Sequence, residues 1–252
     1  CVACLLPPYT QHYIKYINVV LIYLSACSYI TGANSVTTAL GMAAQSDIKL
    51  IYFPIKGLGE PIRFMLAYLG KDYEDYRCRW VEWVNEIKPN TPWGKIPVLE
   101  IDGQRVTQNI PIVRYLGKEA GLGGKDNWED LRIDEIINVI DDLRAELAKY
   151  NYERDENRRA AVKVPLFNEI VPFYMKKLDA HIKENNGYLA NGKLSWADLY
   201  FAAVSDYLSY MYESDITEGY PNVSALKERV YALPQIKEWV EKRIPDIIYS
   251  VR

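Results

Sequence analysis

The chain has 252 residues, of which 49% are hydrophobic and 25% charged, so it is long enough for one large or two ordinary globular domains and too apolar for global disorder. Its 30 basic and 33 acidic residues give a net charge of −3, and no basic run exceeds Arg158-Arg159, which excludes the electrostatic footprint of a nucleic-acid-binding protein. With two histidines and four cysteines, zinc sites, a disulfide scaffold and most histidine chemistry are excluded, and an enzyme has to rely on Tyr, Lys, Asp, Asn or backbone groups.

The first 46 residues differ in composition from the rest. They hold one charged side chain, Lys15, and three of the four cysteines. The apolar run 17–33 is borderline for a membrane span and long for a signal-peptide core. We interpret residues 1–41 as translated upstream sequence or an artefact of the sequence, with a signal or anchor segment and a disordered arm as alternatives. Residues 1–46 are therefore treated as an atypical extension, expected to be disordered or not native, and are excluded from the fold prediction.

Residues 47–122 alternate between short β-rich runs and a helical period. The hairpin signal Asp102-Gly103 lies between two of the runs. The patterns predict strands over 48–53, 72–80, 96–101 and 105–107, helices over 61–69 and 109–121, and a loop with at most a helical turn over 83–93. This order, β-α-β followed by β-β-α, predicts an α/β domain.

Beyond the glycine-rich linker 121–124 the hydrophobic period becomes 3.6. One helix face is marked by Ile133, Ile136, Ile137, Ile140, Leu143 and Leu147. Further helices are predicted over 160–185, 196–212, 222–232 and 234–243, and Ser195 with Asp198 forms a capping-box variant with a structural role. Residues 128–252 are therefore predicted to form an all-α domain.

Two features of the α/β region point to a ligand site. Pro97 opens a strand that otherwise has the composition of a buried one, although a proline cannot donate a ladder hydrogen bond. A cis peptide bond would present the preceding residue's N–H and C=O to an extended peptide, and a plain edge-strand proline is the alternative. Gln108 and Asn109 lie where the last strand gives way to a helix, whose N-terminus attracts carboxylates, but Asn is equally typical of a structural N-cap.

Three further side chains lie close to these features in the sequence. Lys88 and Lys95 flank the same loop and are placed to pair with a second carboxylate, although each alone is typical of a solvated surface lysine. Tyr52 ends the first strand beside a glycine-containing loop, but it is one of 21 tyrosines. Together these residues describe a site for a small anionic peptide, with a tyrosine hydroxyl near its middle.

Five sequence motifs carry a resemblance to a known family. They are Leu50-Ile51-Tyr52-Phe53, Gly59-Glu60-Pro61-Ile62-Arg63, Pro92-Trp93-Gly94-Lys95-Ile96-Pro97-Val98-Leu99-Glu100, Asp102-Gly103 and Ser195-Trp196-Ala197-Asp198-Leu199-Tyr200. From about Ile48 onward the chain resembles the sigma-class glutathione transferases, which include arthropod members and the glutathione-dependent prostaglandin D synthases. The resemblance implies the glutathione transferase fold, with a thioredoxin-like glutathione-binding domain over 47–122 and an all-helical domain over 128–252.

The resemblance also implies a mechanism and a set of site residues. Tyr52 would be catalytic, with its hydroxyl donating a hydrogen bond to the glutathione sulfur and favouring the thiolate. Carried over, the glutathione-binding residues are Trp83, Lys88 and Lys95 for the glycine end, Ile96 and a cis Pro97 for the cysteinyl backbone, Gln108 and Asn109 for the γ-glutamyl carboxylate, and Asp142, reaching from the neighbouring subunit, for the α-ammonium. The second-substrate pocket is expected to be lined by Phe53, Ile55, Leu58 and Tyr200, a surface suited to lipid-peroxidation aldehydes.

These assignments imply a cytoplasmic homodimeric detoxification enzyme that uses glutathione as a cosubstrate. No metal, nucleic acid or membrane span is expected. The alternatives are a glutathione-requiring prostaglandin D synthase and a non-catalytic, crystallin-like or structural protein.

Four positions depart from the family pattern. Asn109 stands where the family usually has Ser, which predicts weaker glutathione binding than for Asn109→Ser. Leu58, Lys149 and Asn138 differ from an Arg, a pocket Trp and a metal-binding acid of the vertebrate synthases, which disfavours a dedicated prostaglandin synthase.

Overall fold

The computed structural model describes residues 47–247, which include a four-stranded sheet. The interpretation of residues 1–46 as an atypical extension lies outside the described residues. The strands are β1 (Ile48–Tyr52), β2 (Glu74–Arg77), β3 (Val98–Ile101) and β4 (Gln104–Thr107). Their order in the sheet is β2-β1-β3-β4, with β1 parallel to β2 and antiparallel to β3, and β3 antiparallel to β4. The predicted order of strands in this half of the chain is confirmed.

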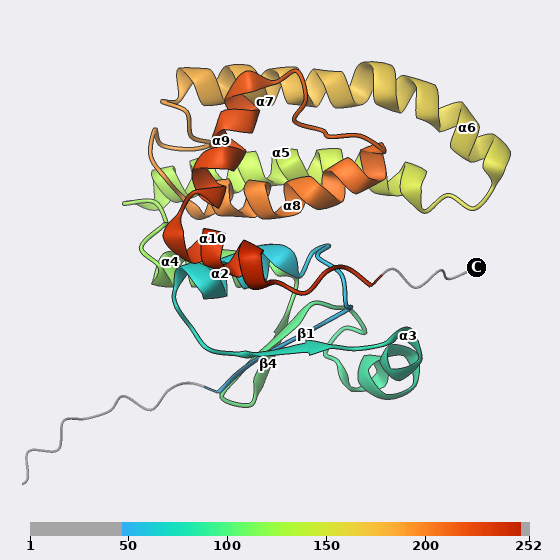
Figure 1. The fold of residues 1–252 in the computed structure, drawn as a ribbon, viewed down its shortest axis with the longest axis vertical. Coiled ribbons are helices and arrows are strands. Elements are labelled where there is room, and N and C mark those ends of the chain that lie inside the picture. The colour runs from blue at the N-terminus through green and yellow to red at the C-terminus, as the bar shows by residue number, and fades with distance from the viewer. Residues whose placement is uncertain (1–46, 248–252) are drawn as a thin grey trace, which may run out of the picture. The chain divides into compact units, whose positions relative to one another are not determined.

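Helices α2 (Glu60–Tyr68) and α4 (Asn109–Glu119) pack on one face of the sheet, between it and the helices that follow in the chain (Figure 1). The segment predicted as a loop is largely helical. It forms a short helix α3 (Trp80–Glu82), a π-helical turn (Trp83–Ile87) and a 3₁₀ turn (Lys88–Asn90). Two prolines and a polar composition concealed this, because three short helical turns carry no continuous 3.6 period.

The second half of the described chain is helical throughout. It consists of α5 (Asn127–Asn151), α6 (Glu156–Pro165), α7 (Val171–Glu184), α8 (Trp196–Tyr212), α9 (Pro221–Tyr231) and α10 (Pro234–Lys242). The predicted helix 160–185 is divided by a π-helical turn, Leu166–Ile170, which begins directly after Pro165. A proline inside a helix removes one backbone hydrogen bond, so the helix changes its winding there.

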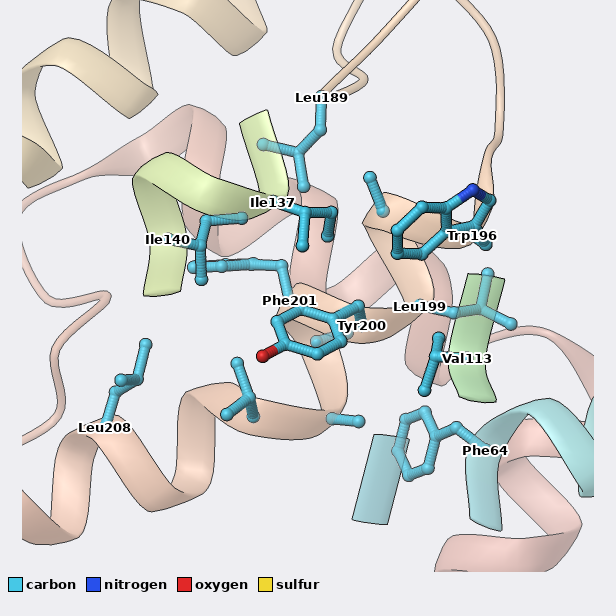
Figure 2. Packing of buried hydrophobic residues seen from close by; sticks show 14 of the residues in the cluster. Phe64, Val113, Ile137, Ile140, Leu189, Trp196, Leu199, Tyr200, Phe201 and Leu208 are labelled. Atoms are coloured by element: carbon cyan, nitrogen blue, oxygen red, sulfur yellow. The ribbon is translucent and has the colours of Figure 1, made fainter. Parts of the chain in front are cut away.

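The larger of two hydrophobic clusters in the described residues joins the two halves. All six apolar positions that were predicted for one face of α5 are buried. Figure 2 shows Phe64 of α2 and Val113 of α4 facing Leu199 of α8 within this core. The predicted capping box is also present, because Asp198 accepts from both the backbone N–H and the hydroxyl of Ser195, at 2.7 and 2.9 Å.

Candidate active site

Three of the predicted site residues meet at one end of the sheet. Tyr52 is the last residue of β1, Pro97 directly precedes β3, and Gln108 directly follows β4. The registers of the antiparallel pairs β1–β3 and β3–β4 align these ends side by side. Since neighbouring strands are about 4.8 Å apart and β3 lies between β1 and β4, the backbones of Tyr52 and Gln108 are separated by roughly 10 Å.

The Tyr52 side chain is enclosed by the loop that follows its own strand. It is 7% exposed, and its hydroxyl oxygen accepts a hydrogen bond from the backbone N–H of Leu58 at 2.9 Å. A Cβ at Gly57 would lie 2.7 Å from this hydroxyl oxygen, and one at Gly59 would lie 2.6 Å from Cδ1 of the ring. The loop can therefore approach the ring this closely only because both positions are glycine.

The hydroxyl of Tyr52 keeps its proton at neutral pH. Burial raises the pKa of Tyr52 to about 12, although the Leu58 N–H and the positive charges of Arg63 and Arg144 act in the opposite direction. Because the bond from Leu58 uses a lone pair of the oxygen, the O–H proton stays available for a second partner. The group is therefore prepared as a hydrogen-bond donor.

Two buried charges, which the sequence analysis quoted within a motif but did not assign to the site, hold this loop from the side of α2. Arg63 has no exposed side-chain surface, donates to the carbonyl of Ile55 at 3.0 Å and pairs with Asp75 and Glu60 at 3.1 and 3.2 Å. Glu60 in turn accepts from Trp239 Nε1 at 2.9 Å. The available signal was a Glu and an Arg three residues apart on a helix that is otherwise apolar.

The Ile96–Pro97 peptide bond is cis, so the cis reading of this turn is confirmed over the edge-strand alternative. Ile96 is half-buried and packs on a small hydrophobic cluster that includes Trp83 and Val98. Trp83 is 6% exposed and stacks edge-on against Phe53, with ring centroids 6.0 Å apart. The π-helical turn that begins at Trp83 thus directs this indole toward the sheet.

The predicted charged ligands lie at the surface. Lys88 and Lys95 are exposed, and a Cβ at Gly94 would lie 3.6 Å from Cε of Lys88, so the two loop ends are neighbours. Asp142 is exposed on α5, and within residues 47–247 no hydrogen bond or ion pair to its carboxylate is found. Its carboxylate is accordingly open to an approaching group.

The N-terminus of α4 combines a strained backbone at Gln108 with a buried hydrogen bond from Asn109 to α8. Gln108 has φ +74°, a region that is costly for any residue with a Cβ and is concentrated at functional sites. Asn109 is 9% exposed and its amide Nδ2 donates to the hydroxyl of Tyr200 at 3.3 Å. Tyr200 was expected to line the second-substrate pocket, but it is 0% exposed and lies in the core, where burial raises its pKa to about 12. The structure therefore places it beneath Asn109, because α8 packs closely on α4.

A cavity of about 290 Å³ lies beside the loop that encloses Tyr52. Its lining consists of Ile55, Lys56, Gly57, Asn151, Tyr152, Asp206, Tyr207, Tyr210 and Asp246. Of the four predicted pocket residues, Ile55 is part of this wall, while Phe53 and Leu58 are half-buried nearby in the chain. The hydroxyls of Tyr152 and Tyr207 are hydrogen-bonded at 2.7 Å, so the cavity is bordered by phenols as well as apolar surface.

Comparison with known proteins agrees with this architecture. Residues 141–243 match the family described as "Glutathione S-transferase, C-terminal domain". Glutathione S-transferase S1 of Drosophila melanogaster is 45% identical over 194 residues, which cover 77% of this chain and 78% of that protein. This chain belongs to the glutathione S-transferase family.

Other relatives of the transferase are named prostaglandin D synthases. Hematopoietic prostaglandin D synthase of Gallus gallus is 36% identical over 201 residues, covering 78% of this chain and 96% of that protein. The solved structure of prostaglandin synthase D of Nilaparvata lugens matches with a TM-score of 0.75 at 47% identity, covering 79% of the transferase and 98% of that chain. The implied fold, with a thioredoxin-like part followed by an all-helical part, is confirmed.

The transferase has little nucleophilic chemistry of its own in the described range. Cys78 is buried and free, and burial raises its pKa to about 11, so it is an unreactive thiol at neutral pH. Between residues 47 and 247, no group of three or more His, Cys, Asp or Glu is arranged to hold a metal ion. None of the helices in this range is both long and apolar enough to cross a membrane.

Proposed function

We propose that the transferase activates the thiol of glutathione with the hydroxyl of Tyr52 and conjugates the resulting thiolate to hydrophobic electrophiles. The observation that carries the proposal is the hydrogen bond from Leu58 N–H to the Tyr52 oxygen, which fixes that oxygen and leaves its own proton free. A hydrogen bond donated to the sulfur stabilises the thiolate relative to the thiol. A pKa lowered by about two units corresponds to about 2.7 kcal/mol of thiolate stabilisation. The thiolate then forms a C–S bond to the electrophilic carbon. In a substitution the leaving group departs with its bonding electron pair, as chloride does from 1-chloro-2,4-dinitrobenzene. In an addition to an unsaturated aldehyde the π electron pair moves to the carbonyl-conjugated carbon, which takes up a proton.

The distance across the sheet supports glutathione as the ligand. With the sulfur of its central cysteinyl residue at Tyr52, glutathione would extend its γ-glutamyl arm past the backbone of Ile96 toward Gln108, about 10 Å away. The γ-glutamyl carboxylate would then lie at the N-terminus of α4, where Asn109 and unpaired backbone N–H groups favour an anion. In this arrangement Trp83, Lys88 and Lys95 would hold the glycine end.

We also propose a homodimer in which Asp142 of one subunit meets the glutathione α-ammonium in the other. Its open carboxylate is in keeping with this role. Exposed aromatic side chains are in keeping with an interface as well: Trp93 is 75% exposed, Tyr115 58% and Trp128 68%, and Trp and Tyr are enriched where protein surfaces meet. The sigma class, a cytoplasmic location and a detoxification role remain predictions from the resemblance, and we expect activity to survive metal chelation.

The second substrate is proposed to occupy the cavity of about 290 Å³ beside the active-site loop. Apolar surface from Ile55 and the tyrosine rings suits an alkyl chain, and the hydroxyls of Tyr152 and Tyr207 suit a carbonyl oxygen. Lipid-peroxidation aldehydes combine these two features. The relatives named as prostaglandin D synthases support isomerisation of prostaglandin H2 as a second candidate, since the same thiolate would serve it.

The test of the mechanism is Tyr52→Phe, which removes one hydroxyl from a buried ring. We expect the pKa of the bound thiol to rise by about two units, kcat with 1-chloro-2,4-dinitrobenzene to fall roughly 100-fold near pH 6.5, and binding to a glutathione resin to persist. Unchanged thiolate absorbance in this variant would reject the mechanism. Product analysis with prostaglandin H2 distinguishes conjugation from isomerisation.

A further inference from the structure

The residues that follow α10 run back across the active-site loop. The backbone N–H of Ile247 donates to the carbonyl of Pro54 at 2.7 Å, and the backbone N–H of Lys56 donates to the carboxylate of Asp246 at 2.7 Å. The carbonyl of Ile244 accepts from Arg77 of β2 at 3.3 Å. Figure 1 shows this red segment passing beside the blue loop between β1 and α2. We name residues 243–247 the C-terminal strap.

The strap binds the part of the loop that orients the Tyr52 hydroxyl. Lys56 lies two residues before Leu58, whose N–H fixes that hydroxyl. On the other side, Arg63 holds the carbonyl of Ile55. The loop is thus held by α2 and by the strap, in addition to its own backbone hydrogen bonds from Ile55 N–H to the Phe53 carbonyl at 2.8 Å and from Gly59 N–H to the Lys56 carbonyl at 3.1 Å.

We propose that Asp246 is a positioning residue for the reaction: by accepting the N–H of Lys56, its carboxylate keeps the loop where Leu58 can align the hydroxyl of Tyr52. The inference rests on the proposed role of Tyr52. Asp246 also forms part of the wall of the second-substrate cavity, so the strap borders both reactants.

The role depends on an acceptor oxygen more than on a charge. The ammonium of Lys56 lies 3.0 Å from Asp206 and 4.0 Å from Asp246, so its nearer ionic partner stays in place when Asp246 is changed. An asparagine keeps an oxygen that can accept the backbone N–H, whereas an alanine does not. The two substitutions therefore separate the hydrogen bond from the charge.

The experiment compares Asp246→Ala, Asp246→Asn and Ile247→Pro in the full chain with glutathione and 1-chloro-2,4-dinitrobenzene. Asp246→Ala is expected to lower kcat about fivefold near pH 6.5 and to raise the pKa of the bound thiol by about 0.7, with KM for glutathione changed less than about twofold. Asp246→Asn is expected to recover most of this loss. Ile247→Pro, which removes the other N–H that the strap gives to the loop, should act in the same direction as Asp246→Ala.

The matched control is Asp126→Ala. The carboxylate of Asp126 also accepts one backbone N–H, from Glu129 at 2.9 Å. It caps the N-terminus of α5, whereas Asn151, which lines the cavity, is at the C-terminus of the same helix, roughly 36 Å away. The proposal is overturned if Asp246→Ala has the same kcat and thiol pKa as this control. It is also overturned if Asp246→Asn does not recover the kcat that Asp246→Ala loses. If Tyr52→Phe left kcat and the pKa of the bound thiol unchanged, the proposed function itself would be rejected, so the two failures are distinguishable.

Discussion

A methyl group added at Gly59 would displace the ring of Tyr52, because the two residues are in close contact. A Cβ at Gly59 would lie 2.6 Å from the ring, and ordinary contact begins at 3.4 Å, so the atoms have to separate by about 0.8 Å. With Tyr52 7% exposed and its hydroxyl held by Leu58, this shift is transmitted to the oxygen. A misplacement of about 1 Å costs roughly 100-fold in rate. We therefore expect Gly59→Ala to lower kcat/KM roughly 100-fold and the free energy of unfolding by about 1–3 kcal/mol.

The assay combines steady-state kinetics with glutathione and 1-chloro-2,4-dinitrobenzene, the thiolate absorbance of bound glutathione, and urea unfolding. Gly123→Ala is the control, because a Cβ there meets only the flexible Lys118 side chain closely, at 3.2 Å, and its φ is not positive. A folded Gly59→Ala protein with the kcat/KM and thiol pKa of this control would refute the reasoning, since the position of the Tyr52 oxygen would then be irrelevant to the rate.

Three other predictions concern the start of α4 and the pH profile. Asn109→Ser gives up the bond to Tyr200 and shortens the side chain at the carboxylate site, so KM for glutathione should fall about two- to fivefold; an equal KM contradicts this. Gln108→Gly relieves φ +74° and should raise the free energy of unfolding by about 1 kcal/mol while raising KM for glutathione, and destabilisation in urea would show that no strain is stored there. Because burial raises the pKa of Tyr52 to about 12, its hydroxyl keeps its proton to high pH. The kcat/KM profile should therefore rise once, as the thiol ionises, and stay level to about pH 10; a fall before that would assign the hydroxyl a lower pKa.

The elements with a continuous period were predictable, and those built from short turns were not. The stripe from Ile133 to Leu147 specifies α5 because a helix of 25 residues repeats its buried face many times. Residues 80–90 form three different helical turns in succession, and none is long enough to repeat a pattern. Pro165 itself signalled the break in the helix predicted over 160–185, but that prediction followed the apolar residues on either side.

The candidate site was predictable where it follows from strand order. Tyr52, Pro97 and Gln108 each adjoin a strand end, so a correct sheet is enough to align them. Asp246 could not be found in this way, because its partner lies 190 residues earlier and the strap has no secondary structure. Tyr200, expected in the second-substrate pocket, lies in the core, and the motif that contains it does not reveal which side of α8 faces that core.

The loop after β1 is held by contacts from distant parts of the chain, which limits how the protein can be recombined. Lys56 contacts both Asp206 of α8 and Asp246 of the strap, and Glu60 contacts Trp239 of α10. A chimaera that joined residues 47–122 to the helices of a distant homologue would inherit Tyr52 and Arg63 but lose Asp206, Trp239 and Asp246. The two halves of this chain are therefore expected to work only as a matched pair, because the loop that carries the Tyr52 contacts takes its support from both.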